Sequence, residues 1–148
     1  MTTNTGSGRE ALDEFLDSTL DSVDSAEDMA LEIARKAGFP EAELHKIAMA
    51  VRECMVNAVV HGNRYNQHKK VHVSVSKTRE RYTVTITDQG EGFDLTSIPD
   101  PLSEENLLRN SGRGIFLIRA FMDEFDVRRL SPSGTEVTLV KYVAAQKR

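Results

Sequence analysis

The chain has 148 residues, of which 39% are hydrophobic and 28% are charged, and its formal net charge is −4 at pH 7. These values describe one ordinary globular domain with enough residues to bury a core, and they exclude fibrous, coiled-coil and wholly disordered proteins. The mild acidity argues against a broad nucleic-acid-binding face, although a nucleotide can still bind where cations are placed locally.

The same composition predicts a protein of the cytoplasm that does not bind membranes. The first residues are polar and lack the apolar segment of a secretory signal. No apolar run approaches the ~20 residues needed to span a bilayer. The single cysteine, Cys54, cannot form an internal disulfide, which fits a reducing compartment.

The first part of the chain predicts a flexible tail, a strand and two helices. Residues 1–14 begin with a polar run of Thr, Asn, Gly and Ser, and a short strand is expected at 15–23. Apolar residues at helical spacing predict a helix at 25–37, with Ser25 as its N-cap, and a second helix at 40–61.

The pattern changes after this second helix. Alternating apolar and polar residues predict four strands, at 71–75, 82–86, 125–130 and 136–143. Between the second and third of these strands we expect a long loop at 93–111 and a helix at 114–123. Residues 144–148 are expected to form a C-terminal tail. Strands joined by short turns, with helices before and between them, indicate an α+β fold with helices on one face of the sheet.

The second helix carries three polar residues that its spacing brings to one side. Glu53, Asn57 and His61 stand four residues apart and share a stripe that borders the apolar stripe of the helix. A carboxylate and an amide one turn apart can hold Mg²⁺ or activate a hydroxyl. The same pattern also fits a plain polar edge of a helix, and these residues alone leave both alternatives open.

A second candidate segment, Asp-Gln-Gly-Glu-Gly, closes the strand at 82–86. Gly90 and Gly92 allow a sharp turn and a close approach of the backbone to a ligand. Asp88 can accept a hydrogen bond from an exocyclic amine such as that of adenine. The alternative is a simple turn between a strand and a loop.

A third candidate segment, Ser-Gly-Arg-Gly at 111–114, opens the helix at 114–123. Free backbone N–H groups at a helix start, next to glycines, make a site for an anion, and Arg109 and Arg113 add positive charge. A glycine-rich loop that merely enters a helix is the alternative. The Gly-Thr pair that ends with Thr135 indicates, by itself, only a turn between the last two strands.

The order of these segments is more specific than any one of them. It resembles the ATP-binding domain shared by Hsp90, gyrase B, MutL and histidine kinases, which is called the GHKL or Bergerat fold. Within that group the chain is most similar to the bacterial anti-sigma factor serine kinases of the RsbW and SpoIIAB type. The stretches that carry the resemblance are VRECMVNAVVHG at 51–62, DQGEGF at 88–93 and SGRGIFLIRAFMD at 111–123.

The resemblance covers residues 15–143 and implies a two-layer α/β sandwich, with a mixed, mostly antiparallel sheet and a mobile ATP lid at 93–111. It implies that Asn57 coordinates Mg²⁺ between the phosphates and that Glu53 is the general base that takes the proton from an attacking serine. Asp88 would bind the adenine amine. Three further residues would shape or support that end of the pocket: Gly90, Gly92 and Thr135.

The resemblance also assigns residues to the phosphate end of the nucleotide. Gly112 and Gly114 would let the helix start meet the phosphates, and either Arg109 or Arg113 would reach the γ-phosphate. His61, at the end of its helix, would lie near the pocket.

The implied protein is an ATP-dependent serine/threonine kinase that phosphorylates an STAS-domain anti-anti-sigma factor and, when free, sequesters a sigma factor. It would use ATP and Mg²⁺ and would form a homodimer. A non-catalytic, ATP-gated regulator with the same fold is the main alternative, and an ATP-hydrolysing or histidine-phosphorylating fragment of a larger machine is another. Glu53 favours the kinase, because a pure binding module needs no base at that position.

Overall fold

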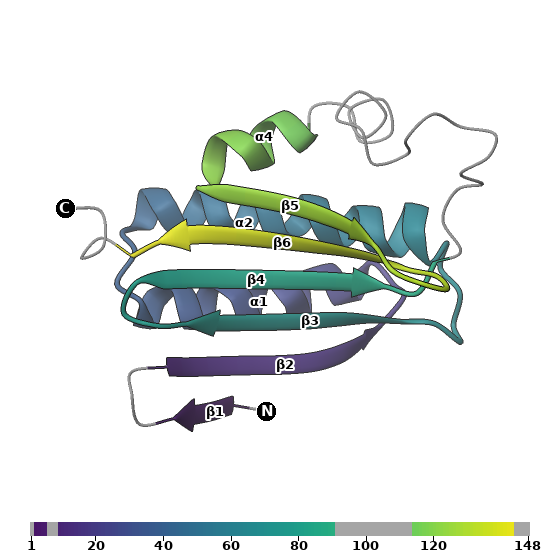
Figure 1. Ribbon diagram of the computed structural model, residues 1–148, viewed down its shortest axis with the longest axis horizontal. Coiled ribbons are helices and arrows are strands. Elements are labelled where there is room, and N and C mark those ends of the chain that lie inside the picture. The colour runs from purple at the N-terminus through teal and green to yellow at the C-terminus, as the bar shows by residue number, and fades with distance from the viewer. Residues whose placement is uncertain (1, 6–8, 91–113, 144–148) are drawn as a thin grey trace.

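The computed structural model describes residues 2–5, 9–90 and 114–143. They form two layers, a six-stranded sheet and a set of helices packed on one of its faces (Figure 1). The strand order is β1-β2-β3-β4-β6-β5. The expected α+β class, with helices on one face, is confirmed.

The described ranges contain six strands and four helical segments. The strands are β1 (Thr2–Thr5), β2 (Arg9–Asp17), β3 (Lys70–Lys77), β4 (Arg81–Asp88), β5 (Glu124–Arg129) and β6 (Thr135–Tyr142). The helical segments are α1 (Asp21–Lys36), α2 (Glu41–Val56), the π-helical turn η1 (Asn57–Gly62) and α4 (Gly114–Phe121).

In the described ranges every pair of neighbouring strands is antiparallel, so the parallel pairs expected in a mixed sheet are not found there. The cause is the number of elements between strands. Two helices in succession separate β2 from β3, and they return the chain to the end of the sheet that it had left (Figure 1). A single crossover helix would have made that pair parallel.

The first long strand lies earlier than expected. β2 pairs with β3 from Glu10 to Asp17, so the strand predicted at 15–23 is wrong in position. Residues 2–5 and 9–14 belong to strands of the sheet rather than to a tail. Leu12 faces the core, whereas Asp13 and Phe15 are exposed on the other face. The acidic residues of this strand obscure the period-two pattern that identifies β3 and β4.

Helix α1 starts at Asp21, about one turn before Ser25, which lies inside the helix rather than at its N-cap. Val23 is buried one turn before Ala26, so the first turn already packs against the core. Asp21 and Asp24 place negative charge in that turn, where the helix dipole favours it.

The core lies between the sheet and helices α1 and α2. Alternate residues of β3 and β4 face the helices and are buried: Val71, Val73, Val75, Tyr82, Val84 and Ile86. The Tyr82 hydroxyl donates a hydrogen bond of 2.7 Å to the carbonyl oxygen of Ala30 and so ties the sheet to α1. None of the helices in the described ranges is long and apolar enough to cross a membrane.

The other elements agree with the predictions to within a few residues. The helix expected at 40–61 is α2 followed without a break by η1, and the helix expected at 114–123 is α4. The long loop predicted at 93–111 and the tail predicted at 144–148 lie outside the described residues.

Candidate active site

The helix that carries Glu53 and Asn57 widens at its C-terminal end. After Val56 the chain forms η1, in which the N–H of Asn63 donates to the carbonyl oxygen of Ala58, five residues earlier, at 2.8 Å. Such π-helical turns occur mostly as single turns and often at functional sites. The wide turn packs against β4, and its last residue, Gly62, lies against Asp88 at the end of that strand.

Glu53 is half-buried on α2 and makes no hydrogen bond or ion pair with a residue that the structure describes. Burial raises the pKa of its carboxyl group, and the charge of His61 acts in the opposite direction as the smaller effect. Asn57, one turn later, is also half-buried and has no side-chain hydrogen bond within the described ranges. The two side chains are therefore available to a ligand at the same helix end.

His61 is exposed in η1, and its charge is the smaller of the two influences on the pKa of Glu53. In a π-helical turn the partner of residue i is i+5 rather than i+4. The straight α-helical stripe predicted for Glu53, Asn57 and His61 therefore ends at Asn57, because the helix widens before it reaches His61.

Asp88 ends β4 and is buried, with 8% of its surface exposed. The backbone N–H of Gly90 donates to Asp88 Oδ1 at 2.9 Å, and the backbone N–H of Thr135, its partner on β6, donates to the same carboxyl group. Burial raises the pKa of Asp88, and these hydrogen bonds and the charges of Arg129 and Lys69 oppose that effect. The carboxyl group is thus a fixed acceptor at the end of the sheet.

Three glycines surround Asp88 so closely that no side chain fits at their positions. A Cβ atom at Gly62 would collide with the Asp88 carboxylate, and one at Gly90 would collide with the carbonyl oxygen of Gly62. At Gly134, where φ is +110°, a Cβ atom would lie 2.6 Å from the Asp88 carbonyl oxygen. The absence of side chains at these positions lets the end of η1, the end of β4 and the turn before β6 come together at Asp88.

Asn63 is a buried residue of this region that the sequence motifs did not indicate. Its side-chain N–H₂ donates to Ser18 Oγ at 2.9 Å and to the carbonyl oxygen of Lys70 at 3.0 Å. Its Oδ1 accepts the N–H of Gln89 at 2.8 Å. Asn63 thereby fixes the segment that follows Asp88, through contacts between residues far apart in sequence that no local pattern reveals.

Thr135 begins β6 directly opposite Asp88, as a residue that supports the same pocket would. Gly114 is the first residue of α4. The other predicted residues of the phosphate end and of the glycine turn lie outside the described residues, and their positions stay predictions: Gly92, Arg109, Gly112 and Arg113.

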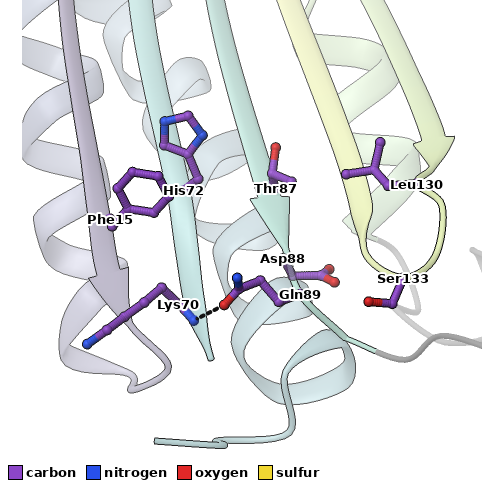
Figure 2. Close-up of a pocket in the computed structure, with 8 residues that line it drawn as sticks. All are labelled: Phe15, Lys70, His72, Thr87, Asp88, Gln89, Leu130 and Ser133. Carbon is purple, nitrogen blue, oxygen red and sulfur yellow. Dashed lines mark hydrogen bonds between the residues drawn. The ribbon is translucent and has the colours of Figure 1, made fainter. Parts of the chain in front are cut away.

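A hollow of about 290 Å³ lies on the open face of the sheet, opposite the helices (Figure 2). Figure 2 shows Phe15, His72 and Thr87 on neighbouring strands of that face, with Leu130 and Ser133 on the far side of the hollow. It shares Asp88 with the candidate site but contains neither Glu53 nor Asn57. The hollow is therefore a feature distinct from the helix-side site.

The described residues fit ATP and Mg²⁺. Asp88 offers a buried carboxylate acceptor, held in place by the backbone N–H of Gly90, which suits a donor such as the exocyclic amine of adenine. Asn57 offers one uncharged oxygen, and the described ranges contain no group of three or more His, Cys, Asp or Glu side chains that could hold a metal ion. Mg²⁺ would then depend on the phosphates and water for its other ligands, as it commonly does in ATP sites.

The class of protein to which this fold belongs is shown by comparison with known sequences, and it is an ATPase-type domain. The profile of the family described as "Histidine kinase-like ATPase domain" matches residues 16–141. The chain belongs to this family and, within it, to the group of RsbW serine-protein kinases and anti-sigma F factors.

Relatives of that group match most of the chain. The serine-protein kinase RsbW of Oceanobacillus iheyensis is 30% identical over 121 residues, which are 78% of this chain and 75% of the relative. The anti-sigma F factor of Bacillus thuringiensis is 35% identical over 104 residues, 69% of this chain and 71% of the relative.

Solved structures support the fold. The RsbU and RsbW domains of Rv1364c from Mycobacterium tuberculosis match with a TM-score of 0.64 and 18% identity, covering 88% of this chain and 32% of that one. The SiaB–SiaC complex of Pseudomonas aeruginosa matches with a TM-score of 0.58 and 12% identity, covering 89% of both chains.

Proposed function

We propose that the chain is an ATP-dependent serine kinase that phosphorylates an anti-anti-sigma factor of the STAS class and, when free, sequesters a sigma factor. The observation that carries the proposal is the placement of Glu53: it is half-buried, makes no hydrogen bond to a described residue, and stands one turn before Asn57 at the helix end that meets Asp88. The names of the matched relatives, a serine-protein kinase and anti-sigma factors, support the same assignment.

ATP is held in this proposal by its two ends. Asp88 accepts a hydrogen bond from the adenine amine, and Thr135 flanks that contact from β6. Asn57 offers its side-chain oxygen to Mg²⁺, which when bound neutralises charge on the phosphates. The start of α4 at Gly114 offers backbone N–H groups to the phosphates.

Glu53 acts as the general base of the transfer. It takes the proton of the substrate serine hydroxyl while the serine oxygen bonds to the γ-phosphorus, and the bond from that phosphorus to the bridging oxygen breaks to leave ADP. Phosphoryl transfer depends on positioning and charge neutralisation rather than on covalent help from the protein. A carboxyl pKa that burial raises makes a stronger base than a fully solvated glutamate.

The proposal extends to the assembly of the protein. The kinase would bind the anti-anti-sigma factor as its substrate and a sigma factor as its regulatory target, and two copies of the chain would form the active unit. Sedimentation of the pure chain, alone and with each candidate partner, measures these three associations directly.

The direct test is incubation of the chain with labelled ATP, Mg²⁺ and purified STAS proteins encoded near its gene, scored for serine phosphate. We expect transfer by the wild type and by Glu41→Gln, a control in which an exposed glutamate of the same helix is changed. Glu53→Gln is expected to bind ATP but to transfer none. Binding of ATP without transfer by the wild type would replace the kinase with the ATP-gated regulator, and a folded wild type that binds no ATP would refute both.

A further inference from the structure

Arg129, the last residue of β5, shares a row with two residues of the proposed adenine site. It stands opposite Thr135 on β6, and Thr135 stands opposite Asp88 on β4. Directly paired residues of neighbouring strands point to the same face of a sheet. Phe125, which lies on that face by the same alternation, packs against the core. Arg129 therefore lies on the helix side, at the end of the sheet where Asp88 lies.

Arg129 is half-buried, and two of its three guanidinium nitrogens are buried without a partner among the described residues. Its Nε and Nη1 atoms are inaccessible to solvent and have no hydrogen-bond partner in the part of the chain that the structure describes. A buried polar atom without a partner is uncommon in native proteins and calls for an explanation, such as a ligand. The neighbouring Arg128 differs, because it lies on the open face and pairs with Glu136 at 2.9 Å.

We infer that Arg129 reads the base of the bound nucleotide, by donating a hydrogen bond to an adenine ring nitrogen beside the amine that Asp88 accepts. The inference rests on the proposed ATP site. Adenine presents an amine donor next to a ring-nitrogen acceptor, which matches a carboxylate and a guanidinium placed in one row. Guanine has a carbonyl oxygen in place of that amine, and this oxygen would face the Asp88 carboxylate.

No motif of the sequence pointed to Arg129, since it falls within an ordinary predicted strand. Its relation to Asp88 depends on the order β4-β6-β5, in which a strand later in the chain separates the two residues. The charge of Arg129 also reaches Asp88, where it helps to lower the pKa of the carboxyl group against the effect of burial. Arg129 thus influences the acceptor as well as offering a donor.

The test compares Arg129→Met with Arg128→Met by titration calorimetry against ATP and against adenosine. Methionine keeps the length and apolar stem of arginine but removes its donors. We expect Arg129→Met to bind both ligands about 10- to 100-fold more weakly, as for loss of a hydrogen bond to a charged group, and Arg128→Met to bind as the wild type does. Arg129→Gln, measured in parallel with thermal unfolding, provides a second variant should the first not fold.

Base analogues separate direct contact from a general effect of charge. The wild type is expected to bind 1-deaza-ATP or 7-deaza-ATP more weakly than ATP, whereas Arg129→Met should bind that analogue and ATP alike. A loss for ATP that spares adenosine would indicate a phosphate contact and overturn the inference. Equal affinity of the wild type and Arg129→Met, or an equal loss in Arg128→Met, would also overturn it. A folded wild type without affinity for ATP would instead refute the proposed function.

Discussion

Replacing Asp88 with Asn is expected to stabilise the free protein and to weaken its binding of ATP. Burial raises the pKa of Asp88, so the folded state disfavours the ionised carboxylate more than the unfolded chain does. A carboxyl group of this kind contributes stability that is fully present below its unfolded pKa and is lost as the pH rises through its folded pKa. At a pH above the pKa of Asp88 in the folded protein, the uncharged Asn side chain avoids this loss of stability.

The loss of ATP affinity follows from the fixed donors around the carboxyl group. The N–H groups of Gly90 and Thr135 donate to Asp88, so they would hold the oxygen of Asn and turn its N–H₂ group toward the adenine amine. Two donors would then face each other where a charged hydrogen bond had been. A hydrogen bond to a charged group contributes about 1.5–3 kcal/mol, which corresponds to a rise in Kd of about 10- to 150-fold.

Thermal unfolding with and without Mg²⁺ and ATP measures both effects. With ATP at 100 times the wild-type Kd, binding stabilises the wild type by about 2.7 kcal/mol, whereas a variant with 100-fold weaker affinity gains only about 0.4 kcal/mol. At roughly 2–4 °C per kcal/mol for a domain of about this size, the ATP-induced rise in Tm should shrink by about 5–9 °C. Asp126→Asn, on the exposed face of β5, is the control. Equal ATP-induced shifts in Asp88→Asn and the wild type would refute the adenine contact.

Three further changes test the rest of the site. The rate of serine phosphorylation should rise with pH through the raised pKa of Glu53, because only the ionised carboxylate accepts a proton, and a rate that stays flat from acid to neutral pH would contradict this role. Asn57→Ala should lose far more affinity for ATP with Mg²⁺ than for ATP with EDTA, whereas similar losses in calorimetry would argue against a metal ligand. Gly90→Ala should lower the unfolding midpoint by several degrees, because its Cβ atom collides with the Gly62 carbonyl oxygen, and an unchanged midpoint would show that the turn can relax.

The parts of the fold that could be predicted are those with a local signal. β3 and β4 alternate buried valine, tyrosine and isoleucine with polar residues, and this alternation locates both strands within a few residues. β2 has no such clean pattern, because Asp13 and Phe15 share its exposed face. Its pairing with β3 is a tertiary contact between segments separated by two helices. A single sequence carries little trace of such a pairing.

The residues of the candidate site differ in the same way: some have a local sequence signal and others depend on tertiary contacts. Glu53, Asn57 and Asp88 could be selected in advance because their side-chain chemistry and spacing point to a ligand. Asn63 and Arg129 could not, because each is identified by what surrounds it: three hydrogen-bond partners in one case and buried, unpartnered nitrogens in the other. Local patterns indicate residues that can do chemistry, whereas residues that hold or read a ligand become visible only when distant segments are placed together.

Among the described residues, Glu53 and Asp88 are two carboxyl groups whose ionised forms burial disfavours. Burial is the main cause of the raised pKa of both Glu53 and Asp88, and the helix-side environment supplies Glu53 with no hydrogen bond from a described residue. In the proposed site a bound nucleotide would offset part of this cost, because the adenine amine would donate a hydrogen bond to Asp88. Any ligand that binds the ionised form preferentially also lowers its pKa, since binding and ionisation are linked. The cost of burying the Asp88 carboxylate in the free protein therefore favours a ligand that presents a hydrogen-bond donor at Asp88.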